Sequence, residues 1–182
     1  MEDQIMNIMD SVFDCTLNMI NKDFSEYPEH RVEFFKLLRT INLRCFPALL
    51  RLDAPTFKNV IDSCMWASKH DNREVEGAGL NMCIELISNM AETNPETCNA
   101  FFQNFYLPIL QDVFFVLTDS DHKAGFKNQS LLLAKMFYLV DSGKIQGPIY
   151  TPDLAPPGTP NKEFLIGFIG NLLSKAFPNL QR

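Results

Sequence analysis

Apolar residues recur every three or four positions along most of the chain, a pattern typical of helices that bury one face. The first such stretch covers residues 3–20, and its stripe consists of Ile5, Met9, Val12, Phe13, Thr16, Leu17 and Ile20. A second helix is expected from Pro28, a residue suited to a first helical turn, until Pro47 bends or ends it. No segment shows a convincing strand-like alternation. The pattern therefore predicts an all-α protein.

Five further helices are predicted, over roughly residues 55–67, 72–92, 95–117, 122–140 and 161–177. Their starts follow turn or capping residues, among them the His70-Asp71-Asn72 turn and the Asn94-Pro95-Glu96 string. Pro108 is expected to kink the fifth helix of the chain. Residues 141–160 contain five of the 11 prolines, so we expect an irregular connection there.

The predicted helices form pairs. The second helices begin near Pro28, Asn72 and His122, which are 44 and 50 residues apart. A period of about 40–47 residues with two helices in each unit is typical of HEAT or armadillo repeats. We therefore predict a single α-solenoid segment over residues 1–182, with about three and a half antiparallel pairs. The pairs cover residues 3–45, 55–93 and 95–141, and a lone helix (161–177) follows the irregular connection at 142–160.

Two local features give sharper expectations. The stretch from Tyr27 to Arg31 should form the corner of the first pair, with Tyr27 partly buried and Arg31 near the start of a helix. The single tryptophan, Trp66, should be part of the core, because aromatic residues at helical spacing are mostly buried. Gly77 and Gly79 lie within an apolar helical pattern, where they favour close packing of helices over the binding of a ligand.

Residues that could support catalysis are sparse. His30, His70 and His122 all fall at predicted corners, too far apart in sequence to suggest a metal site, and we interpret them as turn histidines. The sequence contains neither a GxSxG nucleophile motif nor a phosphate-binding glycine-rich loop. It therefore predicts no enzyme, no metal and no cofactor.

Composition narrows the possible partners and the compartment. The formal net charge is −6, which does not favour direct binding of nucleic acid. The sequence contains no run of about 18 apolar residues, so we expect no membrane span. The first residues lack the basic region of a secretory signal. The five cysteines are far apart and odd in number, which favours reduced thiols in the cytosol or nucleus.

Several longer stretches resemble one known family. They are CTLNMINKDFSEYPEHRVEFFKLLRTIN (residues 15–42), CFPALL, FKNVIDSCMWASKH, FFVLTDSDHKAGFKNQSLLLAKMFYLV and NLLSKAFPNL. Together they resemble the exportin-1 family of nuclear export receptors, within the importin-β or karyopherin superfamily. The similarity is long and collinear, and residues 147–160 match least well.

The resemblance implies a ring-like HEAT solenoid much longer than this chain, of which the chain would be a C-terminal part. Such receptors bind cargo with a nuclear export signal together with the GTP form of the GTPase Ran. They contact nucleoporins and shuttle between nucleus and cytoplasm. The repeats that make the main Ran contacts, and the outer groove for the export signal, are expected outside this chain.

The resemblance also suggests which residues face a partner, because Ran lies inside the ring and second helices commonly line the concave side. On that basis the candidate contact residues are Lys36, Arg39, Glu74, Asn81, Glu85, Lys123 and Lys127. The simpler interpretation is that these residues form solvated helix faces. A second hypothesis for the whole chain also stays open: a helical-repeat regulatory scaffold of a complex unrelated to transport.

Overall fold

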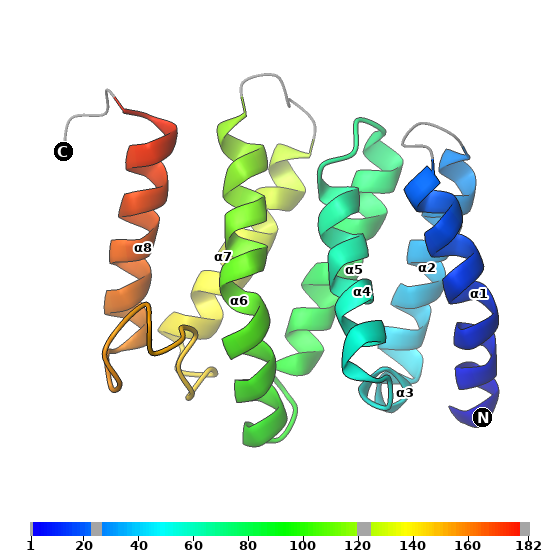
Figure 1. The fold of residues 1–182 in the computed structure, drawn as a ribbon, viewed down its shortest axis with the longest axis horizontal. Coiled ribbons are helices and arrows are strands. Elements are labelled where there is room, and N and C mark those ends of the chain that lie inside the picture. The colour runs from blue at the N-terminus through cyan, green and yellow to red at the C-terminus, as the bar shows by residue number, and fades with distance from the viewer. Residues whose placement is uncertain (1, 23–26, 120–124, 179–182) are drawn as a thin grey trace. The chain divides into compact units, whose positions relative to one another are not determined.

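The computed structural model describes residues 2–22, 27–119 and 125–178, and all regular elements in these ranges are α-helices (Figure 1). The prediction of an all-α protein is therefore confirmed. The helices are α1 (Glu2–Lys22), α2 (Pro28–Arg44), α3 (Phe46–Leu50), α4 (Ala54–Ser68), α5 (Arg73–Met90), α6 (Pro95–Thr118), α7 (Phe126–Asp141) and α8 (Asn161–Ala176).

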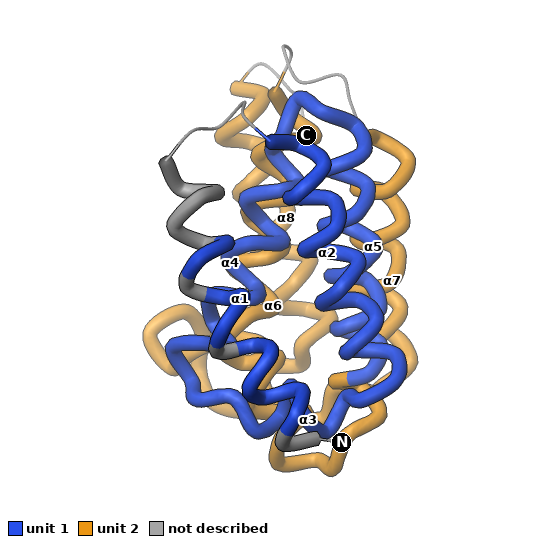
Figure 2. Tube along the Cα trace, turned by 90° about the vertical axis from the view of Figure 1, so that its right-hand side faces the viewer, with its two compact units in different colours: residues 1–89 blue, residues 90–182 orange. Residues whose placement is uncertain are grey.

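The chain divides into two compact units, residues 1–89 and residues 90–182 (Figure 2). Within the first unit the long helices α1, α2, α4 and α5 alternate in direction, and within the second unit α6, α7 and α8 do the same (Figure 1). That residues 1–182 form one continuous solenoid of HEAT pairs stays a prediction.

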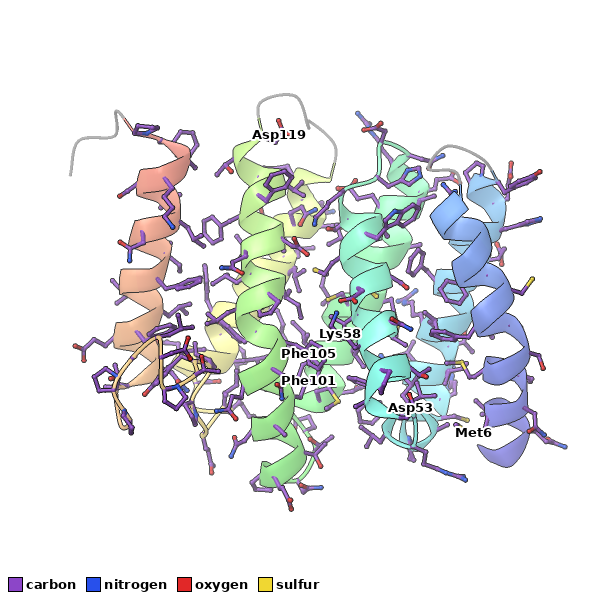
Figure 3. The ribbon with its side chains drawn as sticks, in the orientation of Figure 1. Met6, Asp53, Lys58, Phe101, Phe105 and Asp119 are labelled. Atoms are coloured by element: carbon purple, nitrogen blue, oxygen red, sulfur yellow. The ribbon has the colours of Figure 1, made fainter. Side chains whose placement is uncertain are left out.

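The helix starts follow local capping chemistry. The Asp53 carboxylate accepts a hydrogen bond from the Thr56 backbone N–H at 2.7 Å, and Asn94 caps Thr97 in the same way at 2.9 Å. Each cap stands before a proline in the first turn, where the missing N–H costs nothing. Asp53 lies at the start of α4 (Figure 3).

Pro47 and Pro108 were expected to disturb helices, and the structure shows a different outcome for each. Helix α2 ends at Arg44, and Pro47 lies in the first turn of the short helix α3, so the predicted stop is confirmed. Pro108 lies inside α6, which continues through it to Thr118. The sixth predicted helix, from His122, begins as α7 at Phe126, and residues 120–124 lie outside the described residues.

The corner between α1 and α2 agrees with the sequence only in part. The two helices are separate, α2 begins at Pro28, and Arg31 lies in its first turn. Tyr27 adopts a left-handed backbone conformation with φ 54° and is 54% exposed. Its ring stacks on His30 with centroids 5.9 Å apart. The expectation of a partly buried Tyr27 was therefore wrong, because this ring packs on a surface neighbour.

A buried cation ties α2 to the turn between α4 and α5. Arg31 is 1% exposed, and its guanidinium lies 5.0 Å from the centroid of the Trp66 ring. The two ring nitrogens of His70 face Arg31 Nη1 at 3.1 Å and the Asn72 backbone N–H at 2.9 Å. A neutral imidazole accepts at one of its two nitrogens only, so the tautomer decides which of these contacts is a full hydrogen bond.

Trp66 is half-buried and so less covered than predicted, although the Arg31 guanidinium packs against its ring. His70 is indeed a turn histidine, although only 4% of it is exposed. His30 is exposed beside Tyr27, and His122 lies outside the described residues.

Helices α4 and α5 approach closely at one glycine. A Cβ atom placed on Gly79 would lie 2.4 Å from the Cβ of Ala67, a distance that real side chains do not tolerate. The close packing expected of Gly79 is therefore present. The two helices can approach this closely because Gly79 has no side chain.

In the second unit, α6 contributes more buried residues than any other helix, and α8 contributes one, Leu165. The Tyr106 hydroxyl donates to the Met136 carbonyl oxygen at 3.0 Å, which joins α6 to α7. Helix α6 is long and apolar enough to cross a bilayer by length and composition alone. Nine of its side chains are buried against the rest of the chain, which is the character of a core helix. Phe101 and Phe105 lie one turn apart along it (Figure 3).

The irregular connection predicted for residues 142–160 contains neither helix nor strand, yet it is held by side chains. Asn161 accepts the Ile149 N–H at 3.1 Å and donates to the Gly147 carbonyl oxygen at 2.8 Å. The buried Tyr150 donates to the Thr159 carbonyl oxygen at 2.8 Å. These side-chain hydrogen bonds hold the connection against the start of α8.

Replacing Gly79 with alanine should destabilise the chain. Overpacking a tight contact costs about 1–3 kcal/mol, and the better helix propensity of alanine returns up to about 1 kcal/mol. We expect a net loss of about 1–2 kcal/mol in the free energy of unfolding, measured by urea denaturation.

Gly167→Ala on α8 is the matched control, since an added Cβ there meets no atom within 4 Å. The Gly167→Ala substitution should raise the free energy of unfolding slightly, because alanine has a higher helix propensity than glycine. A Gly79→Ala protein that is stabilised as much as the control would show that α4 and α5 do not pack closely there.

Replacing Arg31 with methionine keeps much of the side-chain volume and removes the charge. The lost hydrogen bond and cation–π contact should lower the free energy of unfolding by about 1–3 kcal/mol. Lys36→Met, an exposed cation on the same helix, should change it by less than about 0.5 kcal/mol. Equal unfolding midpoints for the two variants would contradict the role assigned to the buried cation.

Candidate partner-binding groove

A groove of about 400 Å³ lies between α2 and α5 on the surface of the first unit. We call it the α2–α5 groove. Its lining residues are Val32, Phe35, Lys36 and Arg39 from α2, and Arg73, Glu74, Gly77, Ala78 and Asn81 from α5.

The groove exists because one helix contributes large side chains and the other small ones. Phe35 is fully buried and Val32 is 8% exposed, so both form an apolar floor. On the facing helix, Gly77 and Ala78 fill little of the space above that floor. A partner side chain could therefore reach apolar surface between the two helices.

Three polar contacts fix how α2 and α5 lie against each other. At one end Arg31 contacts His70, in the turn that leads into α5. In the middle Arg39 binds Glu85, and at the far end the Asn89 amide donates to the Asn42 carbonyl oxygen at 2.9 Å. Sequence positions rise together along both helices, so α2 and α5 run parallel.

The Arg39–Glu85 pair closes one side of the groove. Arg39 Nε donates to Glu85 Oε2 at 2.8 Å, and its Nη2 donates to Oε1, so the pair is bidentate. The hydrogen bond to Glu85 raises the pKa of Arg39 above its usual value. The Glu85 side chain is 24% exposed, and the Arg39 side chain 46%. Both charges are therefore partly neutralised within the chain.

The other charges at the groove, unlike Arg39 and Glu85, form no ion pair between the fully described helices α2 and α5. Lys36 Nζ binds Glu33 at 2.8 Å, an exposed pair one turn apart on α2. Glu74 and Arg73 lie in the first turn of α5, which Asn72 caps by accepting the Glu74 N–H at 2.9 Å. Neither side chain makes an ion pair with another residue in the described part of the first unit. Glu74 is thus an exposed carboxylate beside an apolar floor.

The structure brings most of the sequence-predicted contact residues together. Lys36, Arg39, Glu74 and Asn81 all line the α2–α5 groove, and Glu85 lies at its edge through Arg39. Lys127 is exposed on α7 in the other unit. Lys123 lies outside the described residues.

Sequence reasoning missed two components of this groove. Val32 and Phe35 are apolar residues of α2 and were not among the candidate contact residues. Arg73 directly precedes the candidate contact residue Glu74, and it is spaced four and eight residues from Gly77 and Asn81. That helical spacing is the signal that could have found it.

The described residues show neither a reactive thiol among the buried cysteines Cys64 and Cys83 nor a metal site. Burial raises the pKa of the Cys64 thiol and raises that of Cys83 to about 12, so neither forms a thiolate near neutral pH. No group of three histidine, cysteine or acidic side chains in the described ranges is placed to hold a metal ion. The groove is suited to binding a protein surface, with apolar contact at its floor and charges at its rim.

Comparisons with known proteins give one consistent result. The family model described as CRM1 C terminal matches residues 1–182. Exportin-1 of Schizosaccharomyces pombe is 57% identical over 179 residues, which is 98% of this chain and 17% of that protein. Protein EXPORTIN 1A of Arabidopsis thaliana is 42% identical over 181 residues, 99% of this chain and 17% of that protein.

Exportin-1 of Drosophila melanogaster is 39% identical over 180 residues, 97% of this chain and 16% of that protein. The chain thus spans about a sixth of the length of these relatives. The family match covers every residue from the first helix to the last, including both walls of the α2–α5 groove. The chain belongs to the exportin-1 family, in the region described as CRM1 C terminal.

Proposed function

We propose that this chain is the C-terminal part of a nuclear export receptor. The receptor binds the GTP form of Ran together with cargo that carries a nuclear export signal, contacts nucleoporins, and moves between nucleus and cytoplasm. Membership of the exportin-1 family supports this function over the alternative of an unrelated regulatory scaffold. The chain acts by binding and has no catalytic step of its own.

We further propose that α1–α2, α4–α5 and α6–α7 are successive HEAT pairs. The parallel course of α2 and α5 supports this, because second helices of stacked repeats run parallel. The contacts Arg39–Glu85 and Asn42–Asn89 span 46 and 47 residues, within the usual length of such a repeat. Within the first unit, the contacts between α2 and α5 join the first pair to the second, as in other solenoids.

The α2–α5 groove is our proposed contact surface for Ran. The observation that carries the proposal is Glu74, an exposed carboxylate on the rim of a groove whose floor is apolar. A basic group of the partner can pair with Glu74 while an apolar neighbour packs between Val32 and the small residues Gly77 and Ala78. Such rim charges raise the association rate and specificity more than the final affinity.

The test is the association rate of full-length receptor with GTP-bound Ran and an export-signal peptide. Glu74→Lys reverses the charge without breaking an ion pair of the described residues. It should slow association by roughly three- to tenfold at low ionic strength, and the difference should shrink as salt screens the rim.

Two variants control for indirect effects. Glu96→Lys reverses an exposed acid in the first turn of α6 and should leave the rate unchanged. The double variant Arg39→Glu with Glu85→Lys keeps an ion pair across the groove edge and should remain folded. If Glu74→Lys associates as fast as the parent, or Glu96→Lys slows equally, the α2–α5 groove is not the contact surface.

A further inference from the structure

The irregular connection between α7 and α8 contains two threonines that are each followed by proline (Figure 1). They are Thr151, before Pro152, and Thr159, before Pro160, and no other serine or threonine of the sequence precedes a proline. Proline has no backbone N–H, so it fits an apolar pocket in which any other residue would bury an unpaired donor. Proline-directed protein kinases use this property to select the hydroxyl that precedes a proline.

Thr159 differs from Thr151 by a basic residue three positions further along the chain. The string Thr159-Pro160-Asn161-Lys162 ends on a lysine, whereas Leu154 occupies the same position after Thr151. The Lys162 side chain is 69% exposed, so an enzyme can reach it. A kinase with an anionic group beside its active site can bind this lysine by a charge-assisted hydrogen bond. Thr159 is therefore the better substrate of the two.

The charges around the two threonines favour the same choice. A hydrogen bond with Thr151 lowers the pKa of Asp153, so a carboxylate lies beside the Thr151 hydroxyl and would repel a phosphate there. Thr159 instead lies directly before α8, whose N-terminal end carries a partial positive charge. The addition of a phosphate is thus opposed at Thr151 and favoured at Thr159.

The Thr159 hydroxyl lies at the surface of the second unit. Its Oγ1 donates to the Pro156 carbonyl oxygen at 2.8 Å, in an exposed hydrogen bond. The residues just before it are exposed, and Gly158 turns the chain with a φ of 88°. A cavity of about 360 Å³ lies beside Thr159 and Pro160. A kinase therefore has to replace one surface hydrogen bond in order to reach Oγ1.

The first turn of α8 can open locally, which a kinase requires because it binds its substrate as an extended segment. Leu165 is the one residue of α8 that is buried against the described part of the chain. Lys162 pairs with Asp141 at 2.6 Å, but both side chains are exposed and such a pair stabilises little. Two side-chain hydrogen bonds of Asn161 to the connection close the turn again after it has opened.

We propose that Thr159 is a phosphorylation site for a proline-directed protein kinase. The kinase transfers the γ-phosphoryl group of ATP to Thr159 Oγ1. The bond between Oγ1 and phosphorus forms, the bond between that phosphorus and the oxygen of the departing ADP breaks, and the hydroxyl proton passes to the catalytic aspartate of the kinase. The site is independent of the α2–α5 groove and of Ran.

A phosphate on Thr159 strengthens the start of α8. Pro160 stands at the N-cap and accepts no hydrogen bond through its side chain, so α8 lacks the cap that Asp53 and Asn94 give to α4 and α6. The phosphate brings about two negative charges and three acceptor oxygens to this end of the helix, where the dipole favours them. The modification therefore holds the first turn of α8 closed.

The experiment incubates the full-length receptor with a recombinant cyclin-dependent kinase and magnesium ATP, and follows the occupancy of each site by mass spectrometry. Trypsin cleaves after Lys144 and Lys162, so one peptide contains both threonines and its fragment ions compare them directly. We expect the initial rate at Thr159 to exceed that at Thr151 by at least about tenfold. A synthetic peptide of residues 153–165 is the positive control for kinase activity.

Receptor variants separate recognition from stability. Lys162→Ala removes the basic residue and also breaks the ion pair with Asp141, and it should slow the modification of Thr159 at least about fivefold. Asp141→Ala breaks the same ion pair but keeps the lysine, so it is the matched control and should leave the rate within about twofold.

Hydrogen–deuterium exchange tests the effect of the phosphate on α8. Amides of residues 161–165 should exchange several-fold more slowly in the phosphorylated receptor than in a Thr159→Ala receptor treated with the same kinase. The Thr159→Ala receptor controls for modification at any other site of the protein.

Several results would overturn the proposal. The kinase modifies the synthetic peptide but leaves Thr159 of the receptor unmodified, which shows that the folded connection blocks access. Thr151 is modified as fast as Thr159, which removes the preference. Asp141→Ala slows the reaction as much as Lys162→Ala, which shows that the lysine acts through the fold and not through recognition. Exchange in residues 161–165 that is not slowed by phosphorylation overturns the effect on α8.

Discussion

The parallel register of α2 and α5 is the constraint on which the groove depends. Three contacts along the helices fix this register: buried Arg31 with His70, the bidentate Arg39–Glu85 pair, and Asn42 with Asn89. Because these contacts lie at both ends and in the middle, neither helix can slide without breaking polar bonds, one of them fully buried. The register brings Gly77 and Ala78 opposite Val32 and Phe35, and that pairing of small with large side chains opens the groove.

The same kind of helix carries different surfaces in the two units. Helix α5 exposes Glu74 and Asn81 next to an apolar floor, whereas α7 exposes Leu131 and Tyr138 with Lys127. The proposed repeat architecture would allow this, since buried faces in such proteins maintain the packing and leave the exposed positions free to vary. The proposed function therefore depends on side chains at exposed positions, while the fold depends on the buried stripes.

Helical periodicity, capping residues and prolines predicted the elements of this fold well, because these signals act within one or two turns. Asp53 and Asn94 start their helices, and the segment after Asp141 is irregular, as the pattern indicated. What sequence could not predict depends on contacts between distant segments. The cation of Arg31 on Trp66, the pairing of Arg39 with Glu85 and the place of Phe35 at a groove floor all depend on residues that are far apart in the chain.

Hydrogen–deuterium exchange on the full-length receptor tests the central claim most directly, because it reports contact without altering the chain. Addition of GTP-bound Ran with an export-signal peptide should slow amide exchange in residues 32–39 and 73–81, the two walls of the α2–α5 groove. GDP-bound Ran should leave both segments unchanged. Protection that appears elsewhere in the receptor while these two segments exchange at their original rates would contradict the assignment of the α2–α5 groove as a partner surface.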